Sequence, residues 1–174
     1  WERLAEDGSG HVPELLPNLT WTGEKLHADW LAKYLAGDRP AVTRPWLLAQ
    51  MPRFPRAASL LARGLRDQHG IPTSEPAPSP DPTLVEPGRM LISKTGLDCR
   101  QCHAVGRDQP QGDERTQLAY GINFALLRER LRPEFYQRFV LDPGRFDVRT
   151  KMPKLAPDGR STSIREFWEG NAPL

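Results

Sequence analysis

The sequence contains very few of the side chains that bind metals or carry out redox chemistry. Its 174 residues include two cysteines, four histidines and three methionines. With only two cysteines, a network of disulfides cannot hold the fold together. Any cofactor bound through sulfur or imidazole must use residues from this short set, so the positions of these residues are informative.

Long apolar runs and an excess of charge are also missing. No stretch approaches the roughly 20 consecutive apolar residues that a membrane span needs, so we expect no transmembrane segment in this chain. The net charge is +2 at pH 7, which is too small to favour nucleic acid or an anionic membrane surface as a partner. The chain begins at Trp1 without a signal-like segment, and we interpret it as a processed mature chain or a fragment.

Proline and glycine are plentiful instead. There are 18 prolines and 14 glycines, and hydrophobic residues make up 38% of the chain. This composition indicates short elements joined by many loops, around a core that is thin for the length. We expect a loop-rich fold, in which a large flat apolar cofactor would help to fill the core.

The two cysteines and one of the histidines form a C-x-x-C-H motif, Cys99-Arg100-Gln101-Cys102-His103. This pattern is typical of a covalent haem c attachment site. Two thiols at this spacing reach the two vinyl groups of a porphyrin and form thioethers. The following imidazole then lies under the ring, where it can bind the iron as the proximal ligand.

Three other interpretations of the cysteines compete with haem. A thioredoxin-like pair would need a surrounding βαβ pattern, which the sequence does not show. A zinc site would need further ligands, and His11, His27 and His69 lie in a different half of the chain. A disulfide between cysteines so close together is uncommon in a chain of this size.

The second axial ligand of a haem iron is often a methionine. Met90 precedes the motif in an expected helix and is better explained by core packing. Met152 lies in Thr150-Lys151-Met152-Pro153-Lys154, where the proline favours a stiff, extended loop that presents the methionine. We therefore predict His103 and Met152 as the two iron ligands, although a methionine that fills a gap under the loop is the alternative.

The second half of the chain resembles the cytochrome c family. Residues 87–98 look like its amphipathic N-terminal helix, residues 119–124 like the loop over one haem edge, and residues 128–141 form a further expected helix before the Met-Pro loop. The match is specific at C-x-x-C-H and Met-Pro and weak between them. The family's C-terminal helix is represented only by a short candidate at residues 161–170. With the helices expected along the chain, the resemblance implies an all-α, loop-rich fold.

Residues 21–65 repeat the part of the second half that follows the haem motif. Trp30 and Tyr34 are spaced as Phe135 and Phe139 are, and Met51-Pro52 parallels Met152-Pro153, with an expected helix after it at residues 57–65. The repetition indicates a duplicated module. It resembles the tandem cytochrome c domains of large bacterial periplasmic proteins, in which each module has its own C-x-x-C-H.

The first copy has no cysteine. Its haem motif lies upstream of Trp1, or has been lost from a module that survives as a scaffold, or the similarity is coincidental. We expect a degenerate or truncated cytochrome-like lobe at residues 1–69, a Pro-rich connector at 70–87 and a haem-binding cytochrome domain at 88–174.

These expectations together predict an electron carrier with one covalent haem c, rather than an enzyme. Its partner would be a redox protein such as a dehydrogenase or another cytochrome, fused upstream or separate. Because haem attachment to thiols takes place outside the cytoplasm, we expect a bacterial periplasmic or other extracytoplasmic location. The alternative function is a haem-based sensor or small-molecule enzyme with a labile sixth ligand.

Overall fold

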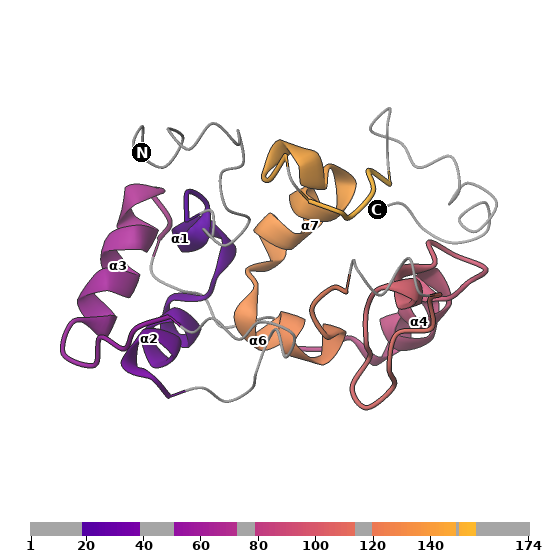
Figure 1. The fold of residues 1–174 in the computed structure, drawn as a ribbon, viewed down its shortest axis with the longest axis horizontal. Helices are drawn as coiled ribbons and strands as arrows, with labels where there is room; N and C mark the ends of the chain where they lie inside the picture. Colours follow the sequence, from indigo (N-terminus) through magenta and orange to yellow (C-terminus); the bar gives the residue numbers. More distant parts are fainter. Residues whose placement is uncertain (1–18, 39–50, 73–78, 114–119, 149, 156–174) are drawn as a thin grey trace, which may run out of the picture.

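The structure is a computed structural model that describes residues 19–38, 51–72, 79–113, 120–148 and 150–155 (Figure 1). Its α-helices are α1 (Thr22–Lys25), α2 (Ala28–Ala36), α3 (Ala58–Gln68), α4 (Val85–Ile92), α6 (Leu127–Arg130) and α7 (Pro133–Leu141). Its 3-10 turns are η2 (Pro82–Leu84), η3 (Cys99–Gln101), η4 (Phe124–Leu126) and η5 (Pro143–Arg145). Within the described ranges there is no strand, only the isolated bridges Leu26–Leu131 and Val105–Asp108. The expectation of an all-α, loop-rich fold is therefore confirmed. None of the described helices is long and apolar enough to cross a membrane.

The main core lies where α1, α2 and α3 pack together. Leu31 and Leu35 on α2 are 4% and 3% exposed, and they face Ala58 and Ala62 on α3, which are 3% and 1% exposed. The small alanines let the two helices approach closely. Leu131, from the joint between α6 and α7, completes this cluster, so the second half of the chain contributes to the core of the first.

The α1–α2 and α6–α7 pairs have matching lengths and meet reciprocally. Each pair is a helix of four residues, two extended residues and a helix of nine residues. The His27 N–H donates to the Arg130 carbonyl over 3.0 Å, and the Arg132 N–H donates to the Lys25 carbonyl over 3.0 Å. These two hydrogen bonds flank the Leu26–Leu131 bridge, so corresponding residues of the two pairs exchange the same interactions, as in a two-fold contact.

The side chains around this bridge are reciprocal too. The Arg130 guanidinium lies 5.2 Å from the centroid of Trp30, and the Lys25 ammonium lies 5.8 Å from that of Phe135. Trp30 stacks on Tyr34 in α2, as Phe135 stacks on Phe139 in α7. Each pair thus places the basic residue at the end of its short helix on the aromatic rings of the other pair.

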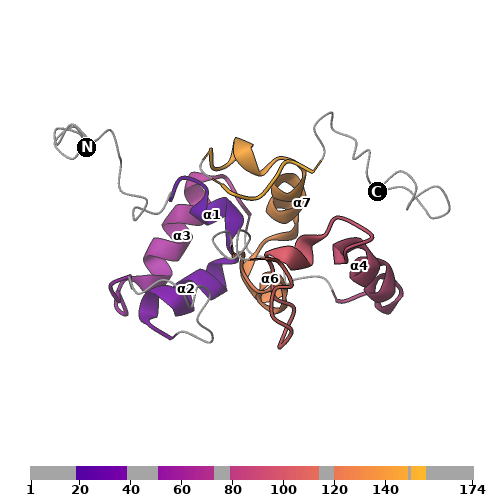
Figure 2. The same ribbon diagram turned by 45° about the vertical axis from the view of Figure 1, so that its right-hand side comes forward.

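An aromatic cluster extends this contact beyond the bridge. Phe146, after η5, lies 4.8 Å from Phe135 and 5.3 Å from Trp21, measured between ring centroids. Trp21 also stacks on His69 at the end of α3. Figures 1 and 2 accordingly show α7 and η5 beside α1, with α4 on the far side of α6 and α7 from α3.

Several expected helices differ in extent from the observed ones. The helix expected at 128–141 is two helices, because Pro133 holds Arg132 in an extended conformation (φ −69°, ψ 132°). The helix expected at 87–98 is α4, which starts earlier, within the predicted connector, and ends at Ile92. The helix expected at 57–65 is α3, which continues to Gln68. The candidate helix at 161–170 lies outside the described residues.

The chain turns back on itself directly after α4. The Leu97 N–H donates to the Leu91 carbonyl over 2.7 Å, and a Cβ on Gly96 would collide with that same carbonyl oxygen. Only glycine therefore allows this close approach. The expectation that Met90 packs in a core is wrong, because its side chain lies on the outer part of α4 and is 47% exposed.

Candidate functional site

The C-x-x-C-H motif forms a 3-10 turn in which the two cysteines and His103 are partly buried and Gln101 is exposed. Cys99 begins η3, and its carbonyl accepts hydrogen bonds from the Cys102 N–H over 3.2 Å and the His103 N–H over 3.0 Å. Asp98, before the turn, has φ +53° and accepts a hydrogen bond from the Gln101 amide. This compact turn brings both sulfurs and the imidazole into one short stretch of backbone, as the sequence predicts.

The His103 ring contacts Ile122, Phe124 and Gly121. Its Nδ1 hydrogen-bonds the Ile122 carbonyl over 2.8 Å, and its face stacks on Phe124 with 4.5 Å between ring centroids. A Cβ at Gly121 would come within 2.5 Å of His103 Nε2 and closer still to two other ring atoms. The ring therefore lies so close to the backbone at position 121 that only glycine fits there.

This hydrogen bond has a chemical consequence for the imidazole. Because Nδ1 faces a carbonyl oxygen, it carries the proton, and Nε2 keeps its lone pair for a metal. Burial lowers the pKa of His103 below its usual value, partly offset by the hydrogen bond to Ile122. The neutral form is the one that binds iron.

The loop at residues 120–124 is joined to the motif by a second set of hydrogen bonds. The Gly121 N–H donates to the Cys102 carbonyl over 2.8 Å, and the Phe124 N–H donates to the Ala104 carbonyl over 2.9 Å. The Asn123 side chain accepts from the Gly106 N–H and donates to the Gly106 carbonyl. The loop predicted to lie over one haem edge thus contacts and orients His103, the predicted proximal ligand.

The two thiols do not have the lowered pKa of a redox-active pair. Burial raises the pKa of Cys99 and of Cys102, and the nearby Asp98 carboxylate raises both further. A thioredoxin-like pair depends on a lowered thiol pKa. Both cysteines are free thiols in the structure, so the alternative of a disulfide between them is not observed.

A zinc-type centre finds no support in the described part of the chain. Nowhere in that part do three His, Cys, Asp or Glu side chains come together in a way that could hold a metal ion. His27 and His69 belong to the α1–α3 side of the molecule, where they contact Leu131 and Trp21. In a haem the porphyrin supplies the equatorial ligands of the iron, and the protein supplies only axial residues. The lack of a three-residue cluster therefore does not bear on haem binding.

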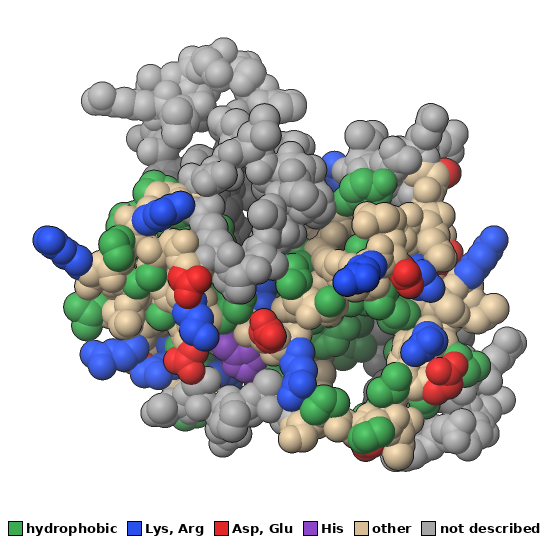
Figure 3. Space-filling view, turned by 90° about the horizontal axis from the view of Figure 1, so that it is seen from below, with side chains coloured by type: hydrophobic (Ala, Val, Ile, Leu, Met, Phe, Trp, Pro, Cys, Tyr) green, Lys and Arg blue, Asp and Glu red, His purple; other side chains and the backbone are tan. Residues whose placement is uncertain are grey.

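An apolar pocket of about 330 Å³ lies against α6 and α7. It is lined by Ser79, Pro80, Leu127, Arg128, Leu131, Pro133 and Tyr136. Figure 3 shows hydrophobic side chains around a hollow between the α6 and α4 ends of the face seen from below. Small-molecule sites typically measure about 300–1,000 Å³, so the pocket is of a suitable size to receive part of a porphyrin.

Met152 occupies a loop attached to the end of α7. Its side chain is partly buried, and its N–H donates to Thr150 Oγ1 over 3.3 Å. Lys154 Nζ pairs with the Asp142 carboxylate over 2.8 Å, which fixes the end of this loop beside the C-terminus of α7. His103 and Met152 thus belong to separately anchored segments, and their joint role as iron ligands stays a prediction.

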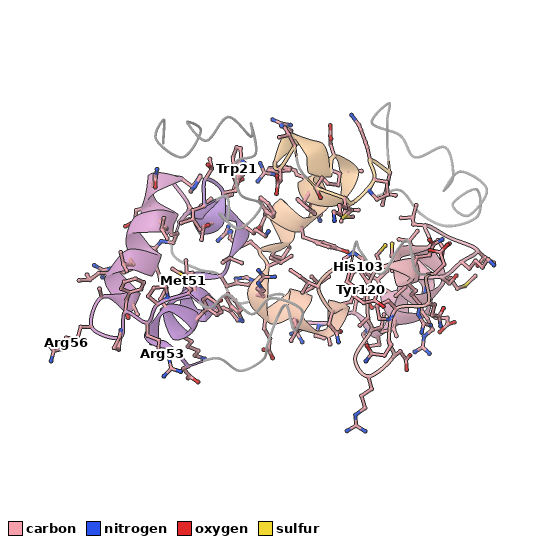
Figure 4. All side chains as sticks on the ribbon, in the orientation of Figure 1. Trp21, Met51, Arg53, Arg56, His103 and Tyr120 are labelled. Carbon is pink, nitrogen blue, oxygen red and sulfur yellow. The ribbon has the colours of Figure 1, made fainter. Side chains whose placement is uncertain are left out.

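Met51, the counterpart of Met152 in the first half, lies with α1–α3, on the other side of α6 and α7 from His103 (Figure 4). Its side chain is 37% exposed.

Gly121 and Ile122 lie in the loop predicted over one haem edge, but their contacts with the His103 ring could not be predicted from the sequence. A glycine between tyrosine and isoleucine gives no signal of its own, because its role depends on the imidazole that it faces.

Comparison of the chain with protein-family models, with curated proteins and with solved structures finds no match.

Proposed function

We propose that this chain is an electron-transferring cytochrome domain with one haem c attached to Cys99 and Cys102 and bound through His103. The observation that carries this proposal is the geometry of His103. Its Nδ1 hydrogen-bonds the Ile122 carbonyl, and its ring stacks on Phe124 and lies close against Gly121. This is how proteins prepare a histidine to bind a metal through Nε2.

The remaining residues of the site fit the same group. Thioether formation adds each S–H across one vinyl group, so the protonated thiols of Cys99 and Cys102 supply the proton as well as the sulfur. The apolar pocket on α6 and α7 offers a surface for a flat macrocycle. When bound, the haem supplies a reversible one-electron couple at its iron, and the protein orients and shields it.

Met152 is the residue we assign to the sixth position. The Lys154–Asp142 ion pair and the hydrogen bond to Thr150 restrict its loop, which suits a residue that must be presented at a fixed place. A neutral thioether favours Fe(II), which raises the reduction potential relative to two histidines. With both axial positions taken, outer-sphere electron transfer is favoured over ligand binding or catalysis.

The reciprocal contact between α1–α2 and α6–α7 supports the hypothesis of a duplicated module. Matching helix lengths alone could be coincidental, but paired hydrogen bonds and paired cation–ring contacts at corresponding residues are not expected by chance. We infer that residues 1–69 form a degenerate or truncated cytochrome-like lobe and that residues 88–174 form the haem-binding domain. A cytochrome-like arrangement of two lobes is part of this proposal.

The partner and the location follow from the chemistry of haem c. We propose a redox protein, such as a dehydrogenase or another cytochrome, as the partner, and a bacterial periplasmic or other extracytoplasmic site of action. Figure 3 shows acidic and basic side chains interspersed over the visible face, so recognition would rely on local complementarity rather than on one strongly charged surface.

The test is the detection of covalent haem. The chain is produced in a bacterium with haem c maturation proteins, and its intact mass and pyridine haemochrome spectrum are measured. One haem per chain is expected, with a spectrum typical of two saturated vinyl groups. Cys99→Ala/Cys102→Ala is expected to carry no covalent haem. A wild-type chain without covalent haem would refute the proposal.

A further inference from the structure

The outer side of α3 and the turn before it carry exposed apolar side chains that the main core does not use. Ala58 and Ala62 belong to that core, so the opposite side of the helix faces solvent. Leu60 and Leu61 are 64% and 42% exposed, and Phe54, in the turn, is 39% exposed. Exposed apolar side chains that are grouped in this way and bordered by charged ones are typical of a surface that binds another molecule.

The charged residues that border these side chains are arginines. Residues 39–66 contain six arginines and no aspartate, glutamate or lysine. Because the net charge of the whole chain is only +2, the rest of the chain is net acidic. Positive charge is therefore concentrated in this one segment, although the net charge of the chain is small.

Three of these arginines lack a carboxylate partner. Arg53, Arg56 and Arg63 are exposed, and they form no ion pair or side-chain hydrogen bond in the described part of the chain. Arg66, at the far end of the segment, pairs instead with Asp67 over 2.7 Å. The three uncompensated charges leave a positive potential around the exposed apolar residues, which favours an acidic partner.

The exposed residues are arranged on one side of the helix and at its start. Leu60, Arg63 and Gly64 have the spacing that places side chains on one helix face, and a Cβ on Gly64 would meet no atom within 4 Å. Figure 4 shows Arg53 and Arg56 pointing outward at the opposite end of the molecule from His103. The α3 surface, as we call it, consists of Arg53, Phe54, Arg56, Leu60, Leu61 and Arg63.

The turn that carries part of the α3 surface is held by backbone hydrogen bonds. The Phe54 N–H donates to the Leu35 carbonyl at the end of α2 over 2.7 Å, and the Ala57 N–H donates to the Phe54 carbonyl over 3.0 Å. The backbone of the turn is therefore fixed to α2 and α3 before any partner binds, which reduces the entropic cost of binding.

We propose that the α3 surface docks a partner protein whose own binding face presents carboxylates around an apolar centre. The guanidinium group pairs with a carboxylate through two parallel hydrogen bonds, and arginine and aromatic residues are enriched in protein interfaces, where lysine is depleted. A helix that binds a membrane surface instead needs a broad apolar face, which two leucines bordered by arginines do not provide. The inference goes beyond the proposed function, because it concerns the first half of the chain and requires no haem.

The test measures the binding of a defined acidic probe to the full chain. The probe is a fluorescein-labelled synthetic helical peptide in which glutamates border a stripe of leucines, and its control is a peptide of the same composition in scrambled order. Fluorescence anisotropy at low salt compares wild type with two variants of the α3 surface, Arg53→Gln/Arg56→Gln/Arg63→Gln and Leu60→Ser/Leu61→Ser. A control variant removes the same charge from exposed arginines elsewhere, Arg89→Gln/Arg107→Gln/Arg145→Gln.

Wild type is expected to bind the amphipathic peptide more tightly than the scrambled one. The arginine variant of the α3 surface is expected to bind it about tenfold more weakly, because three exposed ion pairs are lost and each contributes a small factor. The leucine variant is also expected to bind more weakly, and the control variant to bind as wild type does. All the substituted side chains are exposed, so we expect unchanged melting temperatures.

Several results would overturn the inference. It fails if wild type does not distinguish the two peptides, if the arginine variant binds as tightly as wild type, or if the control variant loses as much affinity. Vesicles with anionic lipid and heparin are tested in parallel, and tighter arginine-dependent binding of either would show that the surface recognises a lipid or another polyanion. Sedimentation tests a second copy of the chain, and an assembly that the arginine variant cannot form would make the chain its own partner. Covalent haem is measured on the same samples, so a failure of the proposed function is recorded separately.

Discussion

Substitution of Gly121 by alanine directly tests the close packing around the His103 ring. The new Cβ would come within 2.5 Å of Nε2, whereas carbon and nitrogen atoms in contact normally lie about 3.5–4.0 Å apart. The ring would have to move away by about 1 Å or more. It cannot do so freely, because Phe124 stacks on it at 4.5 Å and Nδ1 is bonded to the Ile122 carbonyl at 2.8 Å.

The expected loss follows from these two restraints. Overpacking costs about 1–3 kcal/mol, and a weakened hydrogen bond costs about 0.5–1.5 kcal/mol more. We therefore expect Gly121→Ala to lower the free energy of unfolding by about 2–4 kcal/mol. Displacement of the proximal ligand is also expected to shift the Soret band of the haem-bound chain.

The assay is denaturant unfolding of the haem-bound protein, followed by absorption and circular dichroism. Gly144→Ala is the control, since its Cβ would meet only Asp142 Oδ1, at an ordinary 3.7 Å. The double variant Gly121→Ala/Phe124→Leu gives the ring room to retreat and is expected to recover part of the loss. A Gly121→Ala protein with the stability and spectrum of wild type would show that the ring is not confined.

Three further predictions concern the sixth ligand, the interface and α3. Met152→Ala is expected to abolish the near-infrared methionine–iron band, and the control Met90→Ala is expected to preserve it. An unchanged band in Met152→Ala would show that Met152 is not the sixth ligand and would favour the alternative function as a sensor or enzyme. Burial and then the charge of Arg132 lower the pKa of His27 below 6.5, so its stabilising contribution is present above the unfolded-state pKa and is lost as pH falls. As the pH falls from 7.5 to 5.5, the free energy of unfolding of wild type should therefore decrease more steeply than that of His27→Gln, by at most about 1.4 kcal/mol per pH unit. Denaturant unfolding at each pH measures this difference. An equal decrease in the two proteins would contradict the prediction. Gly64 lies within α3 with open space around it, and Gly64→Ala should raise the free energy of unfolding by about 0.5–1 kcal/mol in the same assay, where a decrease would contradict the reasoning.

The helices could be predicted where their signals are local. Apolar spacing and the following Gly37 are sufficient to define α2, and Pro133 marks the start of α7. The expected single helix at 128–141 was wrong because periodicity continues across the break, while Pro133 forces an extended residue before it. The early end of α4 coincides with a local turn in which Gly96 closely approaches Leu91, and apolar spacing alone does not reveal this turn.

The site could be predicted only as far as its covalent chemistry extends. The spacing of Cys99, Cys102 and His103 identifies the attachment motif, because two thiols and an imidazole must reach one ring. The residues that orient the imidazole come from a loop about 20 positions along the chain, and no local pattern connects them to it.

The pairing of the two halves bears on how the proposed electron carrier would work. Were the Pro-rich connector the only link, the haem domain would move freely relative to the first half. Instead, Leu131 is buried in the core of α1–α3, the Glu24 carboxylate pairs with Arg138, and Phe146 packs on Trp21. α7 and the residues at its two ends are therefore fixed to the first half of the chain. A partner that docks on the first half would consequently meet the haem at a constant distance and orientation, which suits repeated electron transfer within one assembly.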